Sequence, residues 1–159
     1  MNDVKTNTKA ETFGKMFRFQ EGIYNNAFEN LTEDVALKRP SERSNHMNWL
    51  LGHVLHCRFM LANMIGSAAK NPFENVYWDA IGNKDYPRIQ EIQGQFPQIG
   101  KELEERLSHM SNDEMDSRPA PDKPSMAELV SFFVYHEAYH LGQLGYARKI
   151  VGLEPLKSH

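Results

Sequence analysis

The segment from Ser125 to Gly152 constrains the fold most strongly, because a long helical pattern there carries two histidines among apolar residues. Ser125 and Glu128 have the spacing of a capping box, and a glycine at position 152 suits the end of a helix. His136 and His140 are four residues apart, so a helix places them on one face, one turn apart. The same face also carries Leu129, Phe132, Phe133, Gln143 and Ala147. We therefore expect this face, with both imidazoles, to point inward.

Three earlier segments repeat apolar residues at the three- and four-residue steps of an amphipathic helix. They cover about residues 12–30, 45–66 and 89–110. Pro97 lies inside the last of them. Because proline removes a backbone hydrogen bond, we expect a kink or a break near residues 93–97. No segment alternates with the two-residue period of a strand. We predict an all-α protein, a four-helix bundle with long connections between helices 1 and 2 and between helices 2 and 3.

The second helical segment is apolar nearly all round. Its side away from His53 carries Leu51, Leu55, Phe59 and Ala62. Such a helix is buried on all sides or meets a second surface, for which a partner subunit is one candidate. The connection that follows, residues 67–86, is long for a compact domain, and long connections are often functional.

Two connections resemble each other. Residues 31–34 followed by Arg39-Pro40 parallel residues 110–113 followed by Arg118-Pro119. The first contains a possible helical turn after Thr32, and each leads into a histidine-bearing helix. Two similar helical hairpins about a pseudo-twofold axis would explain the likeness, and so would coincidence.

The length of 159 residues favours one domain covering 1–159, with 1–10 and 154–159 as flexible ends. The net charge of −3 and the absence of a basic stripe argue against a nucleic-acid partner. The single cysteine, Cys57, excludes an intrachain disulfide. No secretory signal pattern is present, and polar residues interrupt the most apolar run, so we expect a cytoplasmic protein without a membrane partner.

The histidine pair points to a metal ion. Histidines at positions i and i+4 bring two ring nitrogens within reach of one ion, as in many zinc sites. His53 lies mid-helix on the apolar face of the second helix, so we expect it to be the third ligand. Three neutral imidazoles leave a position open for water or substrate, as in catalytic sites. The predicted cofactor is a divalent metal ion, and imidazole suits zinc, nickel and iron as well as copper.

Alternatives remain for individual residues, and none is assigned a catalytic role. A buried histidine is often only hydrogen-bonded, and that interpretation applies to His56. Cys57, one turn after the predicted third ligand, is either a thiolate ligand or a small core residue. Gln143 either orients a bound water or substrate or caps a polar pocket, and Trp49 either packs in the core or lines the pocket mouth. Glu137 points about 100° away from the first histidine and is a poor candidate for a general base.

Two motifs make the chain similar to the DinB/YfiT-like superfamily. One runs from Asn48 to Val54 and contains Leu-Gly-His, and the other is the His-x-x-x-His-x-x-Gln pattern that ends at Gln143. The resemblance implies a four-helix bundle, a homodimer and a metal site whose ligands match His53, His136 and His140. Some relatives are transferases or isomerases that use a low-molecular-weight thiol such as bacillithiol or mycothiol, so the resemblance implies a partner of that kind.

Three functions follow as hypotheses. In the first, a metal-dependent S-transferase, the ion binds a small thiol and lowers its pKa, so that the thiolate attacks an electrophilic small-molecule substrate. In the second, a hydrolase, the ion activates water, although no inward carboxylate base is evident. In the third, the protein is a non-enzymatic, metal-binding dimeric stress protein, which a fourth protein ligand such as Cys57 would favour.

Overall fold

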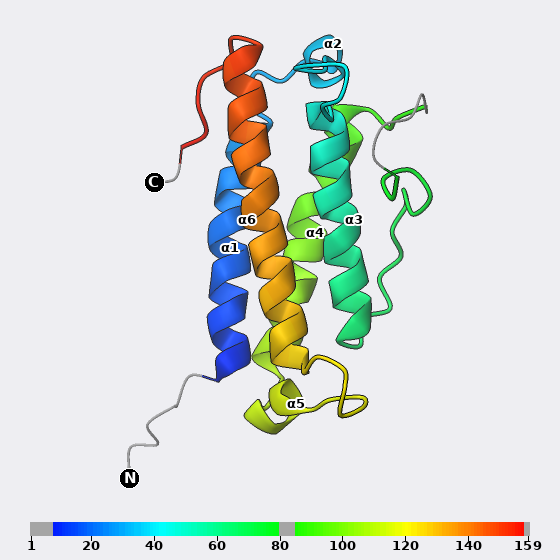
Figure 1. Cartoon of the computed structure of the whole chain (residues 1–159), viewed down its shortest axis with the longest axis vertical. Coiled ribbons are helices and arrows are strands. Elements are labelled where there is room, and N and C mark those ends of the chain that lie inside the picture. The colour runs from blue at the N-terminus through cyan, green and yellow to red at the C-terminus, as the bar shows by residue number, and fades with distance from the viewer. Residues whose placement is uncertain (1–7, 80–84, 158–159) are drawn as a thin grey trace.

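The computed structural model describes residues 8–79 and 85–157, which form helices and no strands, so the prediction of an all-α protein is confirmed. Four helices are long and two are short (Figure 1). In chain order they are α1 (Lys9–Ala27), α2 (Glu33–Ala36), α3 (Met47–Met64), α4 (Ile89–Ser108), α5 (Asn112–Asp116) and α6 (Met126–Ile150). The short helix α2 lies in the connection between α1 and α3, and α5 lies in the connection between α4 and α6. These are the two connections whose sequences resemble each other.

The four long helices pack side by side as a bundle in which α1 and α3 each contact both α4 and α6. Helices α1 and α6 run in one direction, and α3 and α4 run in the other (Figure 1). The parallel course of α3 and α4 requires a long crossover, and the connection after α3 supplies it by returning along the length of that helix (Figure 1). The crossover therefore lies beside α3, close to one of the predicted ligands.

Local signals explain the limits of α6. The Ser125 hydroxyl accepts from the backbone N–H of Glu128, while the Glu128 carboxylate accepts from the N–H of Ser125, which completes the predicted capping box. Gly152 adopts φ +81° just after the helix, a conformation that favours glycine. At α3, the cap is His46, whose Nδ1 accepts from the backbone N–H of Trp49.

Two expectations about helix limits differ from the structure. Helix α1 begins at Lys9 and ends at Ala27, earlier than the expected span of about 12–30, because Thr8 provides the N-terminal cap through its side chain. Helix α4 continues through Pro97 without a break. A proline in the middle of a helix costs one backbone hydrogen bond, and here the apolar positions on both sides of it are buried in one core.

The far side of α3 is covered by the protein's own chain. Leu51, Leu55, Phe59 and Ala62 are all buried within the core. The side chain of Tyr77, from the crossover, is also fully buried and lies directly on Gly52, where any Cβ atom would overlap its ring. The second surface that covers the apolar far side of α3 thus belongs to the same chain and not to a partner subunit.

The expected flexible ends fall largely on residues 1–7 and 158–159, which lie outside the described residues. Within the described part, Ala10 is fully buried in α1, and the backbone N–H of Lys157 donates to Asn26. No helix in residues 8–79 and 85–157 is long and apolar enough to cross a membrane.

Candidate metal centre

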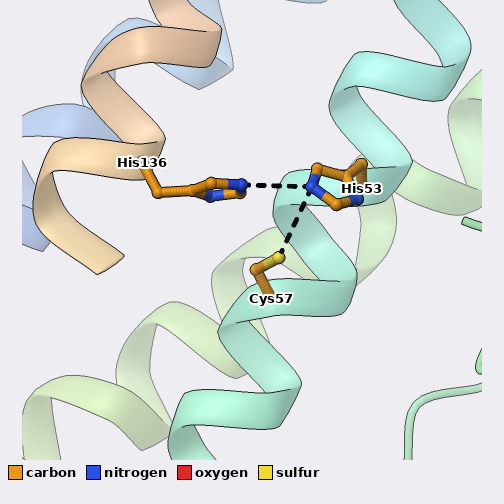
Figure 2. A group of neighbouring side chains, drawn as sticks. All are labelled: His53, Cys57 and His136. Carbon is orange, nitrogen blue, oxygen red and sulfur yellow. Dashed lines mark hydrogen bonds between the residues drawn. The ribbon is translucent and has the colours of Figure 1, made fainter. Parts of the chain in front are cut away.

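Three imidazoles from two antiparallel helices meet between α3 and α6. His53 Nε2 lies 3.1 Å from His136 Nε2, and His140 Nε2 lies 3.1 Å from the same atom. Figure 2 shows the rings of His53 and His136 pointing toward each other across the space between the helices. His140 is buried, whereas His53 and His136 are half-buried. The three predicted ligands are therefore brought together, and their role as ligands remains a prediction.

Hydrogen bonds at the far side of two rings fix which nitrogen faces the cluster. His53 Nδ1 lies 2.9 Å from the carbonyl oxygen of Tyr77, and His140 Nδ1 lies 2.6 Å from Gln143 Oε1. Because these oxygens only accept, each Nδ1 carries the hydrogen and donates it. In the neutral rings, both Nε2 atoms are then bare lone pairs directed at the cluster. Such outer hydrogen bonds are typical of metal-binding histidines.

This arrangement fits a cation better than it fits hydrogen bonds among the histidines. Two bare Nε2 atoms face His136 Nε2, which carries at most one hydrogen and can satisfy only one of them. If His136 Nε2 carries that hydrogen, its buried Nδ1 has no donor to accept from among the described residues. A divalent ion would accept all three lone pairs at once, which is the chemistry that a His donor set provides.

The imidazoles are held in the neutral form that binds metals. Burial and, to a smaller extent, the neighbouring histidines lower the pKa of His136 and of His140 to about 4. Burial also lowers the pKa of His53, despite its hydrogen bond to the Tyr77 carbonyl. At neutral pH the three rings are therefore uncharged, which is the form in which imidazole binds a metal.

The same pKa shifts predict how the metal-free protein responds to acid. Burial also lowers the pKa of His46 to about 4, so the unfolded chain takes up protons below pH 6.5 that the folded chain takes up only near pH 4. Stability should therefore be complete above pH 6.5 and decline as the pH falls toward 4. Urea unfolding with a chelator at several pH values in this window measures the effect.

A matched variant isolates one of these histidines. His46→Asn keeps an acceptor for the N–H of Trp49 but does not titrate, so its free energy of unfolding should fall less steeply with acid. A free energy of unfolding that stays constant between pH 6.5 and pH 4.5 would contradict the prediction.

Cys57 is a further possible metal donor beside two of the histidines. Its Sγ lies 3.8 Å from His53 Nε2, and the ligand atoms of His53, Cys57 and His136 all lie within 4.8 Å of one another (Figure 2). The cysteine is buried, and burial together with the charge of Glu137 raises the pKa of its thiol to about 12. The group is compatible with a metal site, and its donors are those that suit a divalent transition metal.

Aromatic and amide side chains frame the cluster. Trp49 stacks on His53, with ring centroids 4.5 Å apart, and its Nε1 donates to the carbonyl oxygen of Asp79. Trp49 is 4% exposed, so nearly all of its surface is covered by the protein. Gln143 Oε1 accepts the hydrogen bond from His140 Nδ1, and Gln143 Nε2 donates to the hydroxyl of Tyr139.

The expected inward face of α6 is buried only in part. Its buried residues are Phe133, His140 and Ala147, and its half-buried residues are Leu129, His136 and Gln143. Phe132 is 54% exposed and lies beside His136. The most deeply buried residues of α6 lie on the neighbouring face, about 100° around the helix from His136. They include Val130, Leu144 and, unexpectedly, Glu137. Because His53 and His136 are half-buried, the cluster lies close to a partly exposed surface.

A buried ion pair lies directly behind the cluster, and the sequence analysis missed it. Arg58 Nε and Nη2 donate to the two carboxylate oxygens of Glu137, at 2.8 and 3.0 Å, and Nη1 donates to Glu21 at 2.9 Å. Arg58 and Glu137 each follow a cluster residue, Cys57 and His136. The available signal was that Arg58 is the one charged residue of α3, and that Glu137 is the one charged residue of α6 between Glu128 and Arg148. The contact between His53 and the Tyr77 carbonyl could not be predicted from the sequence, because every residue has a backbone carbonyl and no residue type marks this one.

The remaining histidines of the described residues have ordinary roles. His56 Nδ1 lies 3.0 Å from the side-chain amide nitrogen of Asn71, which is the hydrogen-bonded arrangement expected of it. His46 caps α3, and His109 caps the C-terminus of α4.

Comparison with known proteins agrees with this architecture. The family model described as DinB superfamily matches residues 16–144. No curated protein matches the chain. The matched span runs from within α1 to the C-terminal half of α6 and includes all three clustered histidines. The chain belongs to the DinB superfamily.

Proposed function

We propose that His53, His136 and His140 hold a divalent metal ion and that the protein is a thiol-dependent S-transferase. The convergence of three Nε2 atoms, two of them aimed by hydrogen bonds at Nδ1, is the observation that carries the proposal. The candidate ions are zinc, nickel and iron, since imidazole suits each of them. The family resemblance motivates a low-molecular-weight thiol as the partner.

The chemistry divides between the ion and the chain. A bound ion lowers the pKa of a thiol, so that the thiolate forms at neutral pH. The chain positions the histidines through Tyr77 and Gln143 and keeps them neutral through burial. The thiol proton would pass to water, the sulfur would form a bond to the electrophilic carbon, and the leaving group would depart with the electron pair of the bond that breaks. Glu137 is bound to Arg58, so it does not serve as the base that a hydrolase would need.

The test uses metal-loaded protein, an aryl halide electrophile and a panel of thiols that includes bacillithiol, mycothiol and glutathione. We expect thioether formation with at least one thiol, dependent on the metal and abolished by a chelator. Loaded protein that transfers sulfur from none of these thiols would contradict the transferase. Cleavage of esters or amides without any thiol would establish the hydrolase instead.

Gln143 gives a separate prediction for the metal site. Gln143→Leu removes the acceptor of the His140 Nδ1–H while keeping a similar volume. Loss of such an outer hydrogen bond typically weakens metal affinity by about 10–100-fold. Competition with a zinc-binding dye measures it, and Gln143→Glu, which restores an acceptor, should retain most of the affinity. Equal affinity in Gln143→Leu and the wild type would contradict the predicted role.

We also propose that the protein is a homodimer formed through a face shared by α1 and α6. An apolar groove of about 510 Å³ lies there, and Met16, Phe19, Gln20, Ile23, Val134, Ala138 and Leu141 are among the residues that line it. Phe19 is 62% exposed and Met16 is 44% exposed, so a large apolar area faces solvent in the single chain. A second copy of the chain would cover this apolar area, because large exposed apolar patches generally mark interaction sites.

Phe19→Asp should convert the dimer to a monomer, because a charge at the centre of this face cannot be buried without a partner. Light scattering coupled to size-exclusion chromatography measures the mass in solution. Trp78→Asp is the matched control, since Trp78 is equally exposed but belongs to the crossover beside α3. A wild-type monomer, or a Phe19→Asp dimer, would contradict this interface.

A further inference from the structure

The cluster between α3 and α6 contains two pairs of donors with the same spacing. His136 and His140 are separated by one turn of α6, and His53 and Cys57 are separated by one turn of α3. Figure 2 shows the Cys57 sulfur beneath the Nε2 atom of His53, on the side that faces His136. Each of the two helices therefore presents an i, i+4 pair of donors toward the space between them.

The spacing of these atoms agrees with a tetrahedral site. Bond lengths of about 2.0–2.1 Å to nitrogen and about 2.3 Å to sulfur place ligand atoms roughly 3.3 Å apart for two nitrogens and roughly 3.6 Å apart for nitrogen and sulfur. The structure has 3.1 Å for both nitrogen pairs around His136. It has 3.8 Å between His53 Nε2 and Cys57 Sγ. The ligand atoms of His53, Cys57 and His136 also lie within 4.8 Å of one another, so the sulfur belongs to the same donor group as two of the histidines.

We propose that the Cys57 thiolate is the fourth protein ligand, which makes the resting centre a three-histidine, one-cysteine site. The inference rests on the proposed metal site and goes beyond its three-histidine donor set. It concerns a residue outside the two motifs that carry the family resemblance. A thiolate donor selects softer ions such as zinc or cobalt over magnesium, calcium or manganese.

A fourth ligand also changes how the site meets a thiol. With the cysteine sulfur in place, the resting centre has four protein ligands, so the external thiol of the proposed transferase would bind by displacing the Cys57 sulfur, one thiolate replacing another. Without that sulfur, the fourth position is open, and a small external thiol can occupy it. The two cases give different spectra, which makes the proposal testable without any measurement of turnover.

The test uses Co²⁺ in place of the native ion, because cobalt bound to a thiolate has a near-ultraviolet sulfur-to-cobalt charge-transfer band. Cys57 is the only cysteine in the chain, so such a band has one possible source in the protein. We expect the band in the wild type and its loss in Cys57→Ser, with the visible cobalt bands retained. Added 2-mercaptoethanol should restore a sulfur band in Cys57→Ser and change the wild-type spectrum little.

Each outcome decides a different claim. Cobalt that binds to the wild type with no sulfur band overturns the cysteine ligand and leaves the three-histidine site intact. Wild-type protein that binds no cobalt and no zinc overturns the proposed metal site, and the cysteine ligand fails with it. Should Cys57→Ser fold poorly, X-ray absorption of the zinc-loaded wild type is sufficient. A sulfur neighbour at about 2.3 Å supports the inference, and a shell of nitrogen and oxygen alone contradicts it.

Discussion

Replacing Glu137 with alanine is expected to lower the free energy of unfolding by about 3–5 kcal/mol, because it leaves the buried Arg58 guanidinium without its main partner. Arg58 has no exposed side-chain surface, and Glu137 is 2% exposed in its side chain. Burial alone would lower the pKa of Arg58, but the Glu137 carboxylate at hydrogen-bond distance outweighs this effect and raises it. Because a guanidinium keeps its charge in proteins, Arg58 stays charged in the variant, with only Glu21 to compensate it. Urea unfolding at neutral pH measures the loss.

Two further variants test the cause of that loss. Glu104→Ala removes the same kind of charge from the exposed ion pair with Arg18, and it should cost no more than about 1 kcal/mol. The double variant Arg58→Met/Glu137→Leu removes both charges of the buried pair and should recover much of the stability, because no uncompensated charge remains between them. A loss in Glu137→Ala no larger than that in Glu104→Ala would contradict the assigned role.

Replacing His136 with alanine is expected to abolish specific metal binding, because its Nε2 is the atom that both other imidazoles approach. In the wild type, zinc at about 1,000 times its dissociation constant should stabilise the fold by about 4 kcal/mol. The variant should show no such increase. Metal analysis of protein purified without added metal, followed by unfolding with and without zinc, measures both effects.

His56→Ala is the matched control for that experiment. His56 is also a buried histidine of α3, but it binds Asn71 and not the cluster. It should therefore bind zinc as the wild type does, whatever the substitution costs in stability. Equal metal content in the wild type and in His136→Ala would contradict the metal centre itself.

Much of the bundle could be predicted because its signals are local. The capping box at Ser125, the glycine after α6 and the apolar periods of the long helices each depend on residues within a few turns. The histidine pair of α6 is local in the same sense, since a spacing of four residues puts both rings on one face in any helix. His53 could be predicted to join this pair only because a polar side chain on the apolar face of another helix needs a partner in the core.

Other features depended on how the helices rotate and slide against one another. Part of the expected inward face of α6 lies at the edge of the core, where Phe132 is exposed, and Glu137 is buried on a neighbouring face. A helix with apolar residues on most sides does not specify its own rotation, because several orientations bury similar area. The orientation is decided by contacts from distant parts of the chain, here including the salt bridge between Arg58 and Glu137.

The sequence by itself determined the helices, their order and the residue types available for a metal centre. Only the tertiary structure decided which of those residues meet. It brings the Tyr77 carbonyl and Gln143 to the outer nitrogens of two histidines, and it sets Cys57 Sγ 3.8 Å from His53. Periodicity is a property of a single helix, whereas the distance between two side chains on different helices depends on the packing of the whole core.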